Sequence, residues 1–342
     1  MRIRGESFWR VQRRTLGGLK YFVLGLSFLS LLGATATHAE GPTRFRSVSS
    51  APRATRRHPE FSVPARMQPR VRFWIDIFAK YGQHDVVFHH RMHPHVIFDV
   101  LSLGGRAQVL SDKQLERERK SLSDSRERMI RTAIQNLSSG RSPESTLERH
   151  IAKQMAFLGA GTKKYREVLD NGWIRSQRGI KERYREALER SGRYMHILEH
   201  IFVTEFGLPV ELTRLPFVES SFDYKAYSSV GAAGIWQFMP GTGKLFKLQV
   251  SRLVDERRDV TAATKAAAKY LLEAYGKLNA WPLALTSYNH GVYGVMKKVK
   301  QFGTRDIAAL VERVHDQPFG FASQNFYPEF LAALEIYEHP TR

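Results

Sequence analysis

The sequence of 342 residues contains no cysteine. This absence excludes a disulfide framework, a zinc site with thiolate ligands and a cysteine nucleophile. It also excludes a lipid anchor attached to a cysteine near the N-terminus. Hydrophobic residues make up 42% of the chain, which is enough for a packed core, so the chain is not disordered as a whole.

Acidic residues are scarce, with 33 against 53 lysines and arginines, which gives a formal net charge of +20. More than half of this excess lies in the first 72 residues, whereas acids and bases are better mixed from about residue 200 onward. A nucleic-acid interface needs basic residues on a folded face with aromatic residues between them, so no nucleic-acid partner is predicted. The basic N-terminal arm can instead hold an acidic polymer or lipid head groups.

The first 70 residues are predicted to hold an export signal and a linker. Basic residues up to Lys20 precede an uncharged stretch over residues 21–37, and small residues follow as far as Ala39. We therefore expect residues 1–39 to be a signal peptide; the alternative is an uncleaved membrane anchor, because the uncharged stretch nearly reaches the length of a spanning helix. Residues 40–70 contain five prolines and show no helical or strand period, so a linker without fixed structure is expected there.

Residues 71–177 are predicted to form a small, mainly helical region. Apolar residues at helical spacing predict a helix over residues 72–81. Two short β-like runs, 86–88 and 96–98, suggest a β-hairpin. Long, charged and periodic segments over 111–137 and 144–170 indicate two mainly exposed helices.

Residues 178–342 are predicted to form an all-α domain, so the fold class expected for the chain is mainly α. Apolar segments at helical spacing alternate with loops rich in glycine and aromatic residues, and no alternating run is long enough for a sheet. The expected helices cover residues 180–190, 194–206, 260–278, 283–288, 293–302, 306–314 and 325–337.

Glu219 is the strongest candidate for a chemical role. It follows the apolar stretch 215–218, and Phe217, Phe222 and Trp236 are available to surround it. Removal of a carboxyl group from water disfavours its ionised form and raises its pKa, as a general acid at neutral pH requires. The alternative is an ordinary glutamate exposed at the end of a helix.

Two further segments could bind a ligand. In the glycine-rich stretch 228–243 the backbone can approach a ligand closely, while Trp236 could stack on a sugar ring and Gln237 could bond its polar edge. The alternative for this stretch is a turn held by a buried aromatic residue. Tyr288 and Asn289 can direct a hydroxyl and an amide into a cleft.

The histidines give weaker signals. Five of them fall within residues 84–95, a composition that raises the question of zinc binding. No helical i, i+4 pair anchored by a carboxylate occurs there, so neither a metal site nor a cofactor is predicted. His290, which is isolated near the end of a helix, is interpreted as a packing or capping residue.

Three motifs together resemble the signature of the soluble-lytic-transglycosylase family, in particular its D-type membrane-bound lytic murein transglycosylases. They are Glu219-Ser220, the run Gly-Ala-Ala-Gly-Ile-Trp-Gln at 231–237, and Tyr288-Asn289, and they match in order and spacing. The resemblance covers residues 178–336 and implies a goose-lysozyme-like α fold for a catalytic domain at 178–342.

The resemblance also implies a reaction. The substrate would be peptidoglycan glycan strands, cut at the β-1,4 bond between N-acetylmuramic acid and N-acetylglucosamine without water, to leave a 1,6-anhydromuramic acid end. By match of position Glu219 would act first as acid and then as base. The residues expected to line the substrate cleft are Ser220, Ser229, Gln237, Tyr288 and Asn289, in addition to Trp236.

Other features differ from the D-type pattern. The chain lacks the lipid-modified cysteine and the repeated wall-binding modules usual there, and His290 stands where a small residue is usual. We therefore expect an exported protein of the periplasm or cell envelope that is not a lipoprotein and is membrane-tethered only if the signal is retained. Residues 40–72 are expected to contact acidic wall or membrane surfaces, and no motif indicates a protein partner.

The residues by themselves leave two alternative functions open. A hydrolytic muramidase would cut the same bond with water and would need a second carboxylate. Asp223 is the only acid close to Glu219 in sequence, and we interpret it as a turn residue. A non-catalytic wall-binding protein could retain the fold, although the presence of Glu219 argues against it.

Overall fold

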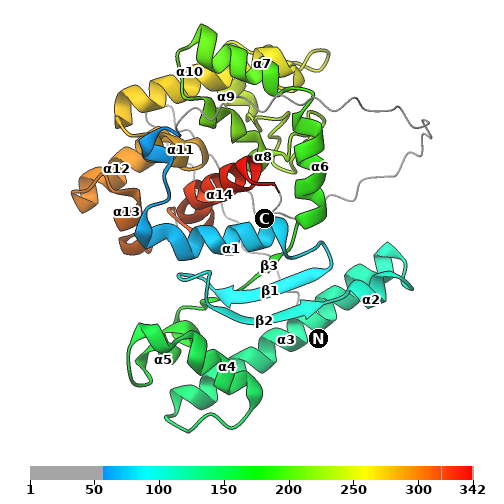
Figure 1. Cartoon of the computed structure of the whole chain (residues 1–342), viewed down its shortest axis with the longest axis vertical. Coiled ribbons are helices and arrows are strands. Elements are labelled where there is room, and N and C mark those ends of the chain that lie inside the picture. The colour runs from blue at the N-terminus through cyan, green and yellow to red at the C-terminus, as the bar shows by residue number, and fades with distance from the viewer. Residues whose placement is uncertain (1–56, 317, 341–342) are drawn as a thin grey trace, which may run out of the picture.

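The computed structural model describes residues 57–316 and 318–340, which form a large helical domain and a smaller lobe (Figure 1). The predicted signal peptide and most of the predicted linker lie outside these residues. No helix in the described part of the chain is long and apolar enough to cross a membrane. The structure is mainly helical, which confirms the predicted fold class.

The segment that leads into the first long helix is folded, not a linker. The short 3-10 helices η1 (Pro59–Phe61) and η2 (Ala65–Met67) place Phe61 in the core, fully buried, with its ring 5.8 Å from that of Phe330. The carboxylate of Glu60 accepts a hydrogen bond from the backbone N–H of Trp281 at 2.5 Å. The prediction of an unstructured linker is therefore wrong over residues 57–70, because buried aromatic contacts fix a segment whose prolines suggested none.

A three-stranded antiparallel sheet lies beneath helix α1 (Gln68–Ala79) in the view of Figure 1. Strands β1 (Asp85–His90) and β2 (Ile97–Ser102) pair as the predicted hairpin. The third strand, β3 (Ile174–Arg178), pairs with the other edge of β1 and was not predicted. Its sequence, Ile-Arg-Ser-Gln-Arg, has no apolar alternation, so only the pairing with β1 makes it a strand.

The two faces of the sheet belong to two different cores. Successive side chains of a strand point to opposite faces. Val86 and Phe88 of β1 pack into a core within the lobe, whereas Val87 joins the core of the helical domain. The sheet is therefore the layer through which the lobe is attached to the rest of the molecule.

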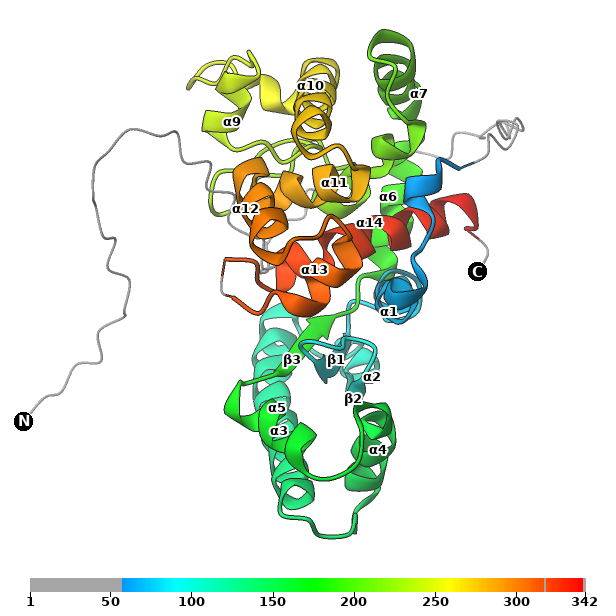
Figure 2. The same ribbon diagram turned by 90° about the vertical axis from the view of Figure 1, so that its left-hand side faces the viewer.

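The lobe is completed by helices on the side of the sheet that faces away from the helical domain (Figure 2). Helix α3 begins after a capping box at Ser111, close to the predicted start. The single helix predicted over 144–170 is wrong, because Gly159 and Gly161 have positive φ angles of 98° and 79° and divide it. The helices of the lobe are α2 (Gly104–Ala107), α3 (Asp112–Ser138), α4 (Thr146–Gln154), η3 (Ala156–Leu158) and α5 (Lys163–Asp170).

The helical domain contains every residue singled out for chemistry. Helix α10 has the predicted bounds, and the side chain of Asp259 caps its first turn. Helix α14 lies in the middle of the domain, beside α1, α8 and α11 (Figure 1). The elements are α6 (Lys181–Ser191), α7 (Met195–Glu199), the π-helix η4 (His200–Glu205), η5 (Val210–Arg214), α8 (Pro216–Glu219), α9 (Pro240–Leu245), η6 (Glu256–Arg258), α10 (Val260–Leu278), α11 (Trp281–His290), α12 (Val292–Phe302), α13 (Ile307–Arg313) and α14 (Phe321–Glu338).

Candidate active site

Glu219 is held at the end of the four-residue helix α8. Phe217, two residues earlier, is buried between Tyr184, whose ring lies 5.3 Å away, and Phe222, whose ring lies 4.6 Å away. Ser221 and Phe222 both have positive φ angles, 57° and 58°, which turn the chain sharply after the glutamate. Non-glycine residues adopt this conformation at a cost, so buried packing of Phe222 must hold the turn in place.

The environment of Glu219 favours its neutral form. Burial raises the pKa of its carboxyl group from 4.5 to about 8, and none of the salt bridges among the described residues involves it. The carboxyl group is therefore mostly protonated at neutral pH, as predicted for a general acid. It lines a cavity together with Val230, Ala232, Gln237, Phe238, Met239, Thr242, Tyr270, Tyr288 and Asn289.

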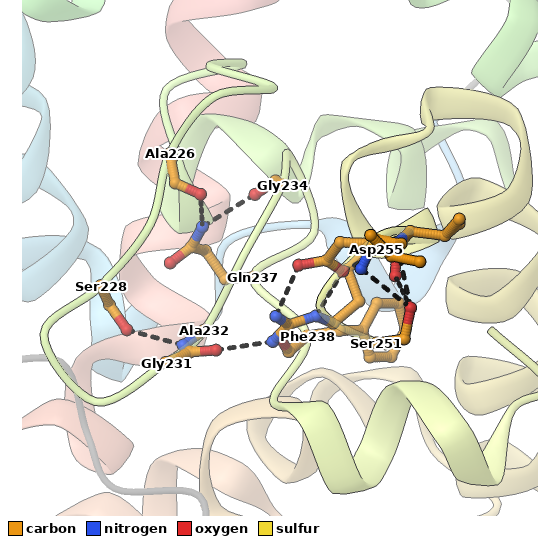
Figure 3. Close-up of polar contacts among 12 residues, drawn as sticks. Ala226, Ser228, Gly231, Ala232, Gly234, Gln237, Phe238, Ser251 and Asp255 are labelled. Atoms are coloured by element: carbon orange, nitrogen blue, oxygen red, sulfur yellow. Dashed lines mark hydrogen bonds and ion pairs between the residues drawn. The ribbon is translucent and has the colours of Figure 1, made fainter. Parts of the chain in front are cut away.

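One wall of this cavity is the glycine-rich loop, which internal hydrogen bonds hold rigid (Figure 3). The buried guanidinium of Arg257 donates to the carbonyl oxygens of Gly231 at 2.6 Å and Phe238 at 2.9 Å, and it is paired with Asp255. Gly234 has a φ of 76°, and a Cβ there would lie 1.8 Å from the carbonyl oxygen of Arg257. The backbone at Gly234 and the carbonyl group of Arg257 are therefore so close that only glycine fits at this position.

Gln237 is fixed by the same loop. Its side-chain nitrogen donates to the carbonyl of Gly234 at 2.8 Å and is 3.4 Å from that of Ala226 (Figure 3). Both N–H groups of the amide are thereby committed to the backbone. The side-chain carbonyl oxygen is the group left to accept a hydrogen bond from a ligand.

Tyr288 and Asn289 come from helix α11 and reach the same cavity. The hydroxyl of Tyr288 donates to the carbonyl of Trp236 at 2.9 Å, and its ring packs edge-to-face on Tyr270. Burial, and secondarily the charge of Glu219, raises the pKa of Tyr288 well above 10, so the phenol stays neutral. Asn289 accepts a hydrogen bond from Ser323 at 3.0 Å through its side-chain oxygen, which leaves its NH2 group as a donor.

Three predicted cleft residues do not line this cavity. The ring of Trp236 is fully buried, stacks on Phe202 at 5.4 Å and donates to Thr264 through Nε1. The prediction that it stacks on a sugar is therefore wrong, and the alternative of a buried aromatic anchor holds. Ser220 is also buried, and its hydroxyl donates to the carbonyl of Ile235 at 2.9 Å. Ser229 is exposed in the loop.

Glu329 on helix α14 is a second carboxyl group near Glu219, and sequence reasoning missed it. Burial raises the pKa of Glu329 well above 4.5, and a negative charge on Glu219, once that group ionises, raises it further. The only signal in the sequence was a single acid inside the otherwise apolar stretch Phe-Tyr-Pro-Glu-Phe-Leu, in which Pro328 lies within the continuous helix α14. Because 110 residues separate the two glutamates, only the tertiary structure could bring them together.

The remaining candidates have structural roles. The carboxylate of Asp223 accepts the backbone N–H of Lys225 at 2.9 Å, which is the predicted turn. The ring of His290 lies 3.1 Å from the hydroxyl of Ser323 and packs edge-to-face on Phe319, as expected of a packing residue. Among the described residues, no three His, Asp or Glu side chains converge as metal ligands would.

Comparison with known proteins points to one family. Residues 205–311 match the family model described as the Transglycosylase SLT domain, a segment that contains Glu219, the glycine-rich loop and Tyr288-Asn289. The predicted resemblance to lytic transglycosylases is thereby confirmed over this segment. The chain is 35% identical over 142 residues to membrane-bound lytic murein transglycosylase D of Escherichia coli strain K12, which covers 41% of the chain and 30% of that protein.

Further similarities are shorter or more distant. A putative tributyltin chloride resistance protein of Alteromonas is 35% identical over 98 residues, 28% of the chain and 47% of that protein. The lytic transglycosylase Slt of Pseudomonas aeruginosa is 20% identical with a TM-score of 0.35, covering 62% of the chain and 35% of that structure. The soluble lytic transglycosylase SLT70 of Escherichia coli is 16% identical with a TM-score of 0.37, covering 64% and 44%. The chain thus spans less than half the length of each of these proteins.

Proposed function

We propose that this protein is a peptidoglycan lytic transglycosylase with Glu219 as its acid and base. The observation that supports this most directly is the neutral carboxyl group of Glu219 in a cavity walled by a rigid glycine-rich loop and by Tyr288. The match of residues 205–311 to the Transglycosylase SLT domain supports the substrate class.

The reaction uses one carboxyl group twice. Glu219 gives its proton to the glycosidic oxygen as the bond from that oxygen to C1 of N-acetylmuramic acid breaks, and N-acetylglucosamine leaves with a free hydroxyl. The resulting carboxylate then takes the proton of the C6 hydroxyl of the same muramic acid. Oxygen O6 bonds to C1, which forms the 1,6-anhydro ring and restores neutral Glu219 without water.

The other cavity residues position the sugar and keep water out. The carbonyl oxygen of Gln237 and the NH2 group of Asn289 provide one acceptor and one donor for the sugar hydroxyls and N-acetyl groups. The rings of Tyr270 and Tyr288 form an apolar wall. A site of low polarity strengthens the interaction between the transient Glu219 carboxylate and the positive charge that develops at C1.

The hydrolytic alternative would now involve Glu329 rather than Asp223. A base that activates water must be ionised, and the pKa of Glu329 is raised well above its ordinary value. A neutral Glu329 favours the transglycosylase reaction, because O6 is already part of the substrate and needs no second base. Asp223 is committed to its turn.

The test is to incubate the protein with purified peptidoglycan and to identify the sugar ends by mass spectrometry. We expect anhydromuramyl products that disappear in Glu219→Gln. Reducing ends would instead establish hydrolysis and implicate Glu329. Binding of peptidoglycan without any product from the unmodified protein would favour a non-catalytic wall-binding role.

We also propose that the protein works in the cell envelope. The support is the basic and apolar pattern of residues 1–39, which is typical of an export signal, and the envelope location of the substrate. Arginines before residue 57 would hold the protein to acidic wall or membrane surfaces by charge attraction.

A further inference from the structure

A pair of arginines lies at the seam where the sheet meets helix α14. Arg175 on β3 stands directly opposite His89 on β1, so both side chains are on the face that meets the helical domain. Its guanidinium lies 4.2 Å from the ring centre of Phe321, the first residue of α14. Arg91, just after β1, donates its backbone N–H to the carbonyl of Trp173 at 2.8 Å, two residues before Arg175. After the larger effect of burial, the charge of Arg91 also lowers the pKa of Arg175.

Arg91 and Arg175, which are both half-buried, lack a carboxylate partner among the described residues. Arg214 is paired with Glu199 and Arg257 with Asp255, whereas no salt bridge among the described residues involves Arg91 or Arg175. The Nε atoms of both are buried with no hydrogen-bond acceptor within the described part of the chain. Two partly desolvated like charges side by side are unfavourable unless an anion offsets them.

Neighbouring groups do not supply that anion. Arg70, the third arginine of the seam, is satisfied by neutral oxygens, since it donates to Asn325 at 3.0 Å and to the carbonyl of Met92 at 2.6 Å. Burial lowers the pKa of His89 to about 3 and that of His93 to about 4, so both imidazoles are neutral at pH 7. Arg91 and Arg175 are therefore the two residues of the seam whose positive charge is not offset by an anion.

The seam is close to the proposed active site along α14. Ser323, two residues after Phe321, donates a hydrogen bond to Asn289, which lines the cavity. Two residues of a helix lie about 3 Å apart along its axis and about 200° apart around it. A peptide side group of a polymer bound in the cavity would therefore have to reach around the first turn of α14 to meet the arginines.

We propose that Arg91 and Arg175 bind a carboxylate of the peptide side chains that peptidoglycan strands carry. This inference rests on the proposed function. Each guanidinium presents a planar set of N–H donors that matches a carboxylate, and two such groups can share one or two carboxylates. Recognition of the peptide would select strands that still bear peptides over strands from which peptides have been removed.

Binding should be measured in the Glu219→Gln protein, so that the result does not depend on turnover. The probes are glycan strands that carry peptides and the same strands stripped of peptides by an amidase, which leaves only the lactyl carboxylate on each muramic acid. We expect Arg91→Gln/Arg175→Gln to weaken binding of peptide-bearing strands by about tenfold or more and to leave binding of stripped strands unchanged. Arg117→Gln/Lys120→Gln, which removes two exposed positive charges from α3, serves as the control with the same charge change and should alter neither.

Several outcomes would overturn the proposal. Equal weakening for both kinds of strand would indicate general charge attraction, and no weakening would show that water alone solvates the two arginines. A phosphate site is the third such outcome. It would be indicated if inorganic phosphate protected the unmodified protein, but not the double variant, against thermal unfolding, while peptide-bearing strands gave no such protection. Because two repelling charges are removed, the double variant should unfold at the same or a higher temperature, which separates lost binding from lost folding.

Discussion

At the scale of single residues, the charge state of each carboxyl group is set by its partners. Asp255 is close to Arg257, and a hydrogen bond with that guanidinium lowers the pKa of Asp255. Glu219 takes part in none of the salt bridges among the described residues, and burial raises its pKa to about 8. The same functional group is therefore held as an anion in the loop and favoured in its neutral form in the cavity.

This state of Glu219 predicts how activity depends on pH. The acid step needs the protonated form, so kcat/KM for glycan cleavage should fall about tenfold per pH unit above pH 8. The measurement is release of anhydromuramyl products between about pH 5 and pH 10. A rate that already falls with increasing pH near the lower end of this range would show that Glu219 has an ordinary pKa.

The raised pKa also predicts a stability effect of Glu219→Gln. Between the ordinary pKa of 4.5 and about 8, the folded protein keeps a proton that the unfolded chain releases, so its free energy of unfolding falls as pH rises. The glutamine side chain of the variant does not titrate, and we expect Glu219→Gln to match the unmodified protein at about pH 4 and to be more stable at about pH 8, by on the order of 3 kcal/mol. Chemical denaturation at both pH values measures this, with the exposed Glu189→Gln as control. A difference that does not change with pH would contradict the prediction.

The second carboxyl group gives a residue-scale test of the mechanism. Because Glu329 is neutral in the proposed reaction, Glu329→Gln should keep the anhydro product and lower kcat less than about tenfold. Comparison with Glu219→Gln in the same product assay provides the reference for full loss. If Glu329→Gln were as inactive as Glu219→Gln, Glu329 would be a required base.

At the scale of elements, the glycine-rich loop depends on one buried side chain. Arg257 joins two ends of the loop by bonding the carbonyls of Gly231 and Phe238, and its own backbone carbonyl touches Gly234. Trp236 anchors the loop to the core by stacking on Phe202. The orientation of Gln237 in the cavity thus follows from packing behind the loop.

The loop predicts a sharp difference between two glycine substitutions. Gly234→Ala would place a methyl group against the Arg257 carbonyl in a strained backbone conformation, so we expect destabilisation by about 3 kcal/mol or more and loss of activity. Gly241→Ala, in the first turn of α9, meets no atom within 4 Å and should fold and react normally. Thermal unfolding and product release measure both effects. Normal activity in Gly234→Ala would show that the loop is not rigid.

At the scale of the whole molecule, the first described residues pack against the last two helices of the helical domain. Arg57 is paired with Glu335 and Glu338 on α14, and Arg66 is paired with Glu312 on α13. These contacts join residues more than 200 positions apart. The sheet attaches the lobe beneath α1, and Arg175 on β3 contacts Phe321 at the start of α14, the helix that carries Glu329.

The basic residues that precede this segment predict salt-dependent adhesion. We expect replacement of four arginines by glutamine to weaken binding to peptidoglycan at low salt, with little difference above about 0.5 M salt, where charges are screened. The matched control removes four exposed positive charges from α3. Equal binding by the unmodified and arm-substituted proteins at low salt would contradict the proposed role of the arm. The arm substitutions are at Arg44, Arg46, Arg53 and Arg56, and the control substitutions are at Lys113, Arg117, Lys120 and Arg128.

The sequence alone determined features that depend on local pattern. Helical periodicity predicted α10 with its observed bounds, and β-like runs predicted the hairpin, because neighbours in the chain decide these structures. The apolar stretch before Glu219 made this residue the candidate acid in the same way. The order and spacing of three motifs were sufficient to indicate the transglycosylase family.

Only the tertiary structure decided features that depend on distant segments. Strand β3 exists through its pairing with β1, and the burial of Trp236 depends on Phe202 and Thr264. Glu329 approaches Glu219 because α14 packs against α8. Hydrophobic burial and electrostatic proximity are properties of assembled surfaces, so a sequence pattern could point to Glu219 as a candidate but could not show which groups surround it.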